Sequence, residues 1–428
     1  RDGVIPSPIA MLVTKTDLYE LNKEQSFYEM MDKVYKKFTD WSPAIFIGYN
    51  NINFDEKFLR SSFYQSLHAP YLTNTNNNSR VDLYKIILSI CNLEKSYLKL
   101  PINPETGKKS LKLEIIAENN SIKHDFAHDA MSDVDATIGL ANLIKKNDST
   151  LWEYLMSFRN HTNVTDFMSS NDIFILPPTN SSGSYIPVTY LTSNPDNIKE
   201  VILYNLEEEV IDDIANARTR QISGLFKGKI LKKIKSNDYP ILLKEDQLTG
   251  GYKEEYLKNK KIYEKRKKDI QSNTNLVMNI NQYLVDQLAD YQVDSRDYTS
   301  ASDHVDELLY SGFTGPSDWK KVEKLAKEND FNSISRILNE FEDTRLPELY
   351  KRKLYSDKKE LLPVNLVEQQ AEYISNKIFN DDLKVPWNTL QKAKQELQKA
   401  KDDKRFSNMS ADIDNIRAYL SDIESNYK

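Results

Sequence analysis

The chain has 428 residues and a formal net charge of −6 at pH 7, and 39% of its residues are hydrophobic and 29% charged. This length favours two or three domains, and no stretch approaches the roughly 18 consecutive apolar residues that a membrane helix needs. The negative charge argues only mildly against nucleic-acid binding, because an enzyme needs a basic groove rather than a basic surface.

The chain contains one cysteine, Cys91. A single cysteine excludes an internal disulfide, a zinc ribbon and a redox pair, and it fits a reducing cytoplasm, the compartment that we expect. Cys91 follows the apolar run Ile86–Ile90, so we interpret it as a small buried hydrophobic residue rather than a nucleophile. The start, Arg1–Pro6, has no apolar core of a secretory signal.

The first third of the chain predicts alternating helices and strands. Ser26–Phe38 has helical spacing of apolar residues, and Ala44–Tyr49 has the pattern of a buried strand. Helical spacing returns over Asp55–Leu67, Val81–Leu93 and Asp129–Lys145. This alternation predicts an α/β domain with an open sheet flanked by helices.

The pattern changes from about residue 165. Short β-type runs lie at 173–176, 186–191, 201–204, 228–234 and 240–243, which predicts a small barrel or sandwich. From about residue 300 the pattern is helical, most clearly over 387–401 and 409–427. We therefore expect three domains, at 1–150, 151–299 and 300–428.

Two segments carry residues suited to catalysis. In Gly48–Asp55, a carboxylate follows a buried strand at a helix start, the region where open α/β sheets bind ligands. In His124–Thr137, the predicted helix has an apolar stripe of Ala130, Val134, Ile138 and Ala141. Asp133 borders this stripe and should face partly inward, whereas Asp135 should face water.

An inward carboxylate is costly unless it is paired or binds a metal. Carboxylate oxygens suit Mg²⁺ or Mn²⁺, and a histidine such as His128, just before the helix, can accept a proton from water. Each residue alone also has an ordinary structural interpretation: Asp55 as a helix cap, and His128 as a surface or core residue.

Taken together, these residues match a known pattern. Asn50–Asp55 resembles the second motif of the DEDD exonuclease superfamily, and His128 to Asp133 is similar to the third motif of its DEDDh branch. The longer strings around them, with Asn78–Leu83 and Asp303–Phe313, resemble bacterial exodeoxyribonuclease I. The resemblance spans essentially the whole chain.

The resemblance implies roles for these residues. Asp55 and Asp133 would be metal ligands and His128 the general base, with two Mg²⁺ ions in the intact enzyme and Mn²⁺ as an alternative. The implied activity is 3′→5′ hydrolysis of single-stranded DNA to 5′-mononucleotides in DNA repair or recombination. The implied fold is an RNase H-like exonuclease domain whose first strands are missing, then an SH3-like β-barrel domain and a C-terminal all-α domain.

One family motif is absent. No Asp-x-Glu occurs upstream of Ser26 in a strand-like context, although the family carries that motif on the first strand of its sheet. We interpret the sequence as an N-terminally incomplete form of an active enzyme and expect the chain as given to be inactive. The alternative is a degenerate, catalytically inactive module that binds single-stranded nucleic acid.

Basic residues suggest where DNA would bind. Lys229 and Lys233 lie in a run that reads as a basic strand, which suits phosphate contact, although lysines also protect solvated strand edges. Arg60 and Arg80 lie close to the motifs. The stretch with Tyr350, Lys351 and Lys353 mixes cations and aromatics, as sites for single strands do.

Three further expectations concern substrate and partners. RNA remains a possible substrate, because proofreading exonucleases and oligoribonucleases share these motifs, although the long C-terminal extension argues against the small oligoribonucleases. The resemblance implies contact with single-stranded DNA-binding protein, for which we assign no residues. We expect a monomer with no membrane association.

Overall fold

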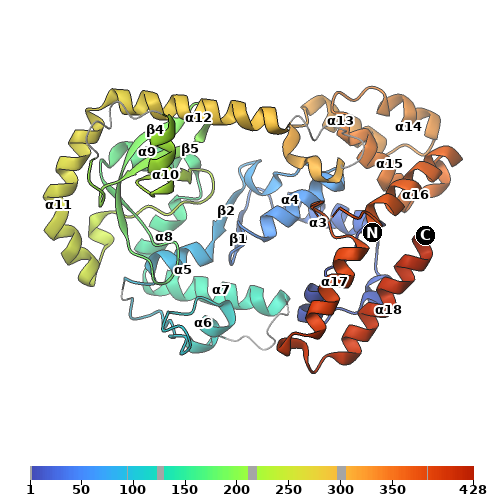
Figure 1. Ribbon diagram of the computed structural model, residues 1–428, viewed down its shortest axis with the longest axis horizontal. Coiled ribbons are helices and arrows are strands. Elements are labelled where there is room, and N and C mark those ends of the chain that lie inside the picture. Colours follow the sequence, from blue (N-terminus) through green and yellow to red (C-terminus); the bar gives the residue numbers. More distant parts are fainter. Residues whose placement is uncertain (1, 94, 123–129, 211–218, 296–304, 383) are drawn as a thin grey trace. The chain divides into compact units, whose positions relative to one another are not determined.

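The computed structural model describes residues 2–93, 95–122, 130–210, 219–295, 305–382 and 384–428 (Figure 1). The chain forms two compact units that are discontinuous in sequence. Unit 1 comprises residues 1–42, 57–72 and 298–428, and unit 2 comprises 43–56 and 73–297. The predicted domain boundaries at 150 and 299 stay predictions. No helix within the described ranges is long and apolar enough to cross a membrane.

The α/β part of unit 2 contains two parallel strands, β1 (Ile45–Gly48) and β2 (Ser79–Asp82), with Gly48 opposite Asp82. The predicted helix over Val81–Leu93 is shorter than expected. Val81 and Asp82 belong to β2, and α5 (Leu83–Ile90) begins after Asp82, whose carboxylate caps it. Val81 is the one apolar residue of β2 and lies just before the apolar run of α5, so periodicity assigned it to the helix.

The prediction that β1 is a buried strand is wrong. Ile45 and Ile47 are each about two-fifths exposed, while every residue of β2 is buried. The apolar strand β1 is thus partly exposed, while β2, which carries Ser79, Arg80 and Asp82, is the buried strand of the pair.

The helices of this part are α6, α7, α8 and α9, which span Leu113–Asn119, Ala130–Asn147, Ser149–Ser157 and His161–Ser170. Their apolar faces join one core with α5 and the antiparallel sheet. Cys91 is buried as predicted, and burial raises the pKa of its thiol to about 11. A thiol of that pKa is a poor nucleophile at neutral pH.

A four-stranded antiparallel sheet fills the middle of unit 2, in the order β3-β4-β5-β6. Its strands span Phe174–Leu176, Ile186–Asn194, Asn197–Asn205 and Leu231–Lys235. The predicted run at 240–243 forms only an isolated bridge, from Leu243 to Ile175. Residues 228–230 are not part of β6: they follow α10 (Thr219–Lys227) in a turn in which Lys229 has a φ of 61°.

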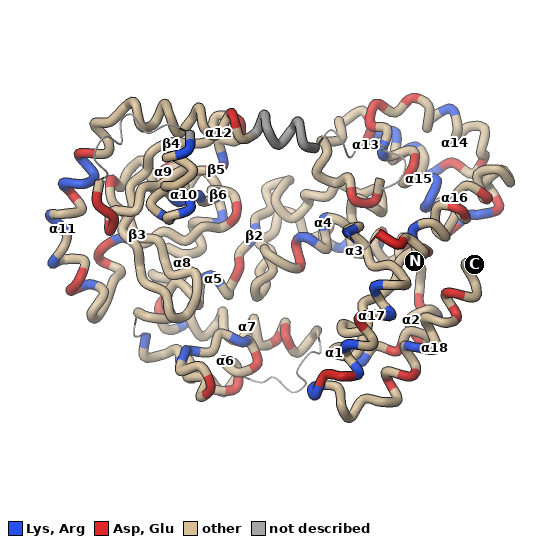
Figure 2. Tube along the Cα trace, in the orientation of Figure 1, with Lys and Arg blue, Asp and Glu red and all other residues tan. Residues whose placement is uncertain are grey.

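Two long helices, α11 (Gly250–Gln271) and α12 (Thr274–Ser295), both contact β4 (Figure 1). Acidic residues are interspersed among the lysines and the arginine of α11 (Figure 2). This distribution is typical of a solvated helix face rather than of a phosphate-binding surface.

Unit 1 is helical in its described part. Its helices are α1 (Pro8–Thr14), α2 (Leu18–Leu21), α3 (Phe27–Trp41), most of α4 (Asp55–Gln65), α13 (Pro316–Leu325), α14 (Phe331–Leu338), α15 (Arg345–Asp357), α16 (Val364–Ile378), α17 (Leu390–Lys401) and α18 (Ser410–Tyr427). A 3-10 segment, η5 (Val305–Ser311), precedes α13. The predicted helices at 26–38, 387–401 and 409–427 are confirmed within a few residues at each end.

Candidate active site

The Asp55 segment is a tight turn held by hydrogen bonds. Asn50 has a φ of 58°, and its N–H donates to Asp82 Oδ1 over 2.8 Å. A Cβ at Gly48 would stand 2.6 Å from Asn51 Cβ, so only glycine fits there. Asp55 is the first residue of α4, as its sequence position predicts, and it is exposed.

Asp82 links this turn to α5. Its carboxylate is fully buried, and Oδ1 also accepts from the N–H of Tyr84 over 3.1 Å. Burial raises the pKa of Asp82, against the lowering effect of hydrogen bonds from Asn50 and Tyr84. Asp82 therefore fixes the turn that leads to Asp55, a role that was missed because a carboxylate at a helix start is an ordinary cap.

Next to Asp55, Glu56 is buried and paired with Arg80 over 3.3 Å. Thr73 donates a hydrogen bond to the same carboxylate oxygen over 2.8 Å, and Arg80 also donates to Asn237 O over 3.2 Å. Arg80, predicted to contact phosphate, thus has a structural role among buried groups, and a phosphate contact would be additional to it.

Arg80 also lines a cavity of about 290 Å³ in unit 2, together with Arg159, His161 and Lys199. None of the described residues that line this cavity is acidic. Burial and the nearby Lys199 lower the pKa of His161. Cationic and amide groups in such a cavity suit phosphate oxygens.

Asp133 lies in the first turn of α7 and is half-buried, whereas Asp135 is exposed, as predicted. The predicted apolar stripe itself is wrong. Val134 and Ile138 are about half exposed, and the buried face of α7 carries Ala136, Leu140 and Ile144 instead. Asp133 borders that buried face, because positions 133, 136, 140 and 144 follow one another at helical spacing.

His128 lies outside the described residues, so its predicted role as general base stays a prediction. Among the described residues, no group of three His, Cys, Asp or Glu side chains could hold a metal ion. Asp55 and Asp133 are the right type of ligand for Mg²⁺, but as described they do not make a complete metal centre.

The predicted DNA contacts in unit 2 are accessible. Lys229 and Lys233 are exposed, and Lys233 pairs with Glu200 over 3.2 Å and lies 5.1 Å from the centre of the Phe226 ring. In unit 1, the Arg60 guanidinium lies 5.3 Å from the centre of the Tyr71 ring. These positions allow phosphate contact without requiring it.

The stretch at 350–353 differs from the prediction. Tyr350 is buried in the core of unit 1, and its hydroxyl donates to Leu325 O over 2.8 Å. Its ring is almost entirely covered, and the predicted contact of Tyr350 with a base stays a prediction. Lys351 pairs with Glu348 over 2.6 Å, and Lys353 with Asp32 over 3.2 Å.

Relatives by sequence are exodeoxyribonucleases I. The chain is 29% identical over 377 residues to that enzyme of Buchnera aphidicola subsp. Schizaphis graminum, covering 82% of this chain and 73% of the relative. It is 26% identical over 374 residues to that of Escherichia coli, covering 81% and 74%. No family model matches the chain.

Solved structures of exonuclease I are also similar to this chain. Escherichia coli exonuclease I in complex with a 5cy-dA13 oligonucleotide has a TM-score of 0.82 at 21% identity, over 100% of this chain and 90% of that one. Exonuclease I of Methylocaldum szegediense has a TM-score of 0.81 at 21% identity, over 98% and 89%. The fold is therefore that of the multidomain exonucleases, and the predicted fold class is confirmed. The sequence relatives specify it further: bacterial exodeoxyribonucleases I match about four-fifths of the chain at 26–29% identity, which supports the predicted resemblance to that family.

Proposed function

We propose that this protein is a 3′→5′ exonuclease that degrades single-stranded DNA to 5′-mononucleotides in DNA repair or recombination. One observation carries the proposal: within unit 2, Asp55 begins α4 after the turn that follows β1, and Asp133 is half-buried in the first turn of α7. Both are positions at which the family's motifs carry metal ligands. The family relationship supports the activity and the substrate class.

The proposed cofactor is Mg²⁺, with Mn²⁺ as a substitute. Divalent ions would stabilise the attacking and leaving oxygens of the phosphodiester. Asp55 and Asp133 are proposed as two of the ligands, and Asp82 keeps Asp55 in place through the turn at Asn50. His128 is proposed to accept the proton of the attacking water. Arg60, Lys229 and Lys233 are proposed phosphate contacts, to which Arg80, Lys351 and Lys353 are added as secondary candidates.

The test compares two proteins: the 428-residue chain and the longest in-frame product of its gene. Each is incubated with 5′-labelled single-stranded DNA and Mg²⁺, and products are resolved by length. We expect progressive shortening from the 3′ end by the longer product and little by the 428-residue chain, which contains only two of the expected carboxylates. Intact oligonucleotide with both proteins would refute the proposal.

A matched pair of variants tests whether the Asp133 carboxylate takes part in catalysis. In the longer product, Asp133→Asn should reduce the kcat of hydrolysis by at least about 100-fold, because loss of a group that stabilises transition-state charge typically costs that much. Asp135→Asn, two residues further along the same helix and exposed, should leave kcat unchanged. Equal rates for the two variants would remove Asp133 from the site.

The comparisons do not favour the alternative of a binding module without catalysis. That alternative predicts binding of oligonucleotides with a steep salt dependence and no turnover by either protein. The same assay with RNA oligonucleotides tests the sugar preference.

We also propose a protein partner and a location. One solved structure similar to this chain is described as an SSB/exonuclease I complex with an inhibitor, which supports contact with single-stranded DNA-binding protein. The single, buried cysteine fits the proposed cytoplasmic location. Co-sedimentation with that protein would test the contact.

A further inference from the structure

Unit 1 displays an unusual group of exposed aromatic rings. Phe313 is 88% exposed and Tyr310 is 68% exposed. The Phe313 ring lies 5.9 Å from the ring of Tyr71, which in turn lies 5.3 Å from the Arg60 guanidinium. We call these four residues the aromatic platform. Its members come from two segments of unit 1 about 240 residues apart, so tertiary structure brings them together.

Hydrogen bonds from Arg345 hold the loop that carries Phe313. Arg345, largely buried at the start of α15, donates to Leu308 O over 2.6 Å, Ser311 Oγ over 3.1 Å and Gly312 O over 3.1 Å. Asp343 orients the guanidinium through two hydrogen bonds of 2.8 Å. A loop with this many buried polar contacts holds its exposed ring in one place.

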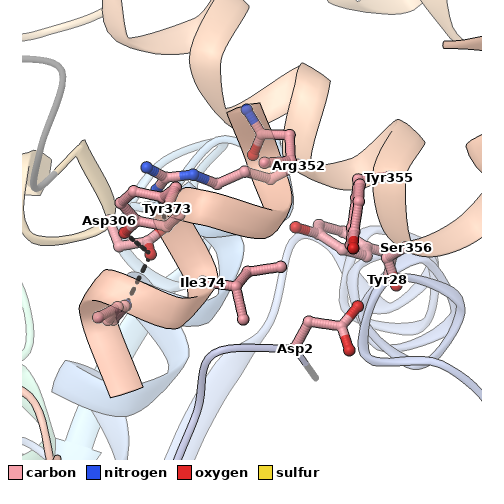
Figure 3. Close-up of a pocket in the computed structure, with 10 residues that line it drawn as sticks. Asp2, Tyr28, Asp306, Arg352, Tyr355, Ser356, Tyr373 and Ile374 are labelled. Carbon is pink, nitrogen blue, oxygen red and sulfur yellow. Dashed lines mark hydrogen bonds and ion pairs between the residues drawn. The ribbon is translucent and has the colours of Figure 1, made fainter. Parts of the chain in front are cut away.

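The segment preceding the loop, η5, is anchored as well. The buried Asp306 pairs with Arg352 over 2.6 Å and with Lys377 over 2.8 Å, and the Tyr373 hydroxyl donates to it over 3.2 Å. Figure 3 shows Asp306 of this segment close to Arg352 and Tyr373. From α4, the Tyr64 hydroxyl donates to Val305 O over 2.8 Å.

This anchoring indicates a binding surface. A large apolar ring that the core could cover is instead kept in solvent by a rigid loop, a cost that binding can offset. The platform is narrow and combines rings with a guanidinium and the hydroxyls of Tyr71 and Tyr310, unlike the broad apolar patches of protein interfaces. Bases stack on such rings, and Arg adds cation–π and phosphate contacts.

We propose that Arg60, Tyr71, Tyr310 and Phe313 form a base-stacking site for single-stranded nucleic acid. This proposal builds on the proposed nuclease function and assigns part of its substrate path. One base stacks on the exposed face of Phe313, Tyr71 supports that ring from the side, and Arg60 takes a neighbouring phosphate.

The experiment separates stacking from general binding. Affinity of the 428-residue chain is measured by fluorescence anisotropy without divalent cations, with a dT oligonucleotide and with an abasic strand of equal length. Phe313→Ala should weaken binding of the dT strand roughly 5- to 150-fold, the range for loss of one stacked base. Binding of the abasic strand should barely change. Phe313→Trp should keep the affinity for dT.

A matched control is Tyr19→Ala. Tyr19 is also exposed and packs edge-on against Tyr419, but its hydroxyl donates to Asp422 rather than lying beside a cation. This variant should leave both affinities unchanged. Arg60→Gln should flatten the salt dependence of dT binding by a slope on the order of one.

Three outcomes would overturn the proposal: an unchanged dT affinity in Phe313→Ala, an equal loss with both strands, or a wild-type dimer that Phe313→Ala converts to a monomer in sedimentation. The last would identify a self-association surface. Base-dependent binding through Phe313 without hydrolysis by any form of the protein would refute the nuclease proposal alone. Hydrolysis with no effect of Phe313→Ala would refute only the stacking site.

Discussion

Two regions of unit 1 contain the same residue types and differ in almost every other respect. The stretch Tyr350–Tyr355 has two tyrosines and three cations in six residues, yet Tyr350 is buried and Arg352 pairs with the buried Asp306. The aromatic platform draws its rings and its arginine from distant segments, and Phe313 is almost fully exposed.

The helix that contains the buried stretch supports the loop that carries the exposed ring of the platform. Arg352 anchors η5, and Arg345 from the same helix holds the loop that displays Phe313. A basic and aromatic composition is compatible with either role, because a cation that pairs with a buried carboxylate and one that meets a phosphate are identical in sequence.

The largest expected effect follows from removal of the buried anchor. Asp306→Ala leaves Arg352 and Lys377 without their shared carboxylate and should lower the free energy of unfolding by about 3–5 kcal/mol. Urea unfolding followed by circular dichroism measures this. Asp414→Ala, which removes only an exposed partner of Arg417, should change stability by less than about 0.5 kcal/mol. Similar losses of stability in both variants would mean that the ion pairs of Asp306 do not anchor η5.

A second prediction sets the two regions directly against each other. Tyr350→Phe removes the hydrogen bond to Leu325 O and should cost about 1–3 kcal/mol of stability, without altering the intrinsic affinity for DNA. Phe313→Ala should do the reverse, because its exposed ring contributes little to folding. Thermal melts and anisotropy titrations on both variants suffice. A loss of DNA affinity in folded Tyr350→Phe would restore Tyr350 to the binding surface.

Acid should loosen the loop that carries the platform. Burial alone would raise the pKa of Asp343, but hydrogen bonds from Arg345 and Thr314 outweigh it and hold this pKa below its usual range. A carboxylate with a lowered folded pKa contributes stability above its unfolded pKa of about 3.9, and that contribution is lost as pH falls through the folded value.

The measurement is the urea midpoint of wild type and Asp343→Asn at pH 6 and below pH 4. The wild type should be the more stable protein at pH 6, and the difference should shrink on acidification. A constant difference would mean that the charge of Asp343 is not what holds Arg345.

The smallest effect is expected at the partly exposed ion pair between Lys353 and Asp32. Lys353→Gln removes a partly exposed pair with Asp32 and should cost at most about 1 kcal/mol of stability. If Lys353 contacts a phosphate as proposed, the salt dependence of DNA binding should flatten by a slope on the order of one. An unchanged slope would exclude Lys353 from the contact set.

Sequence alone determined the elements whose signals are local. Ser26 caps α3 as an apolar stripe begins, and Asp55 begins α4 directly after the turn from β1. These features depend on neighbours within a few residues, which a helical period or a cap reveals. The same local strings identified the family, because its motifs are short and contiguous.

Tertiary structure decided which apolar and charged groups are buried. Val134 and Ile138 read as a core stripe but are about half exposed, while Tyr350 reads as a surface residue but lies in the core. Tyr71 and Phe313 meet across about 240 residues of chain. Periodicity tells which residues share a face, but only the partner that packs against that face determines whether it is buried.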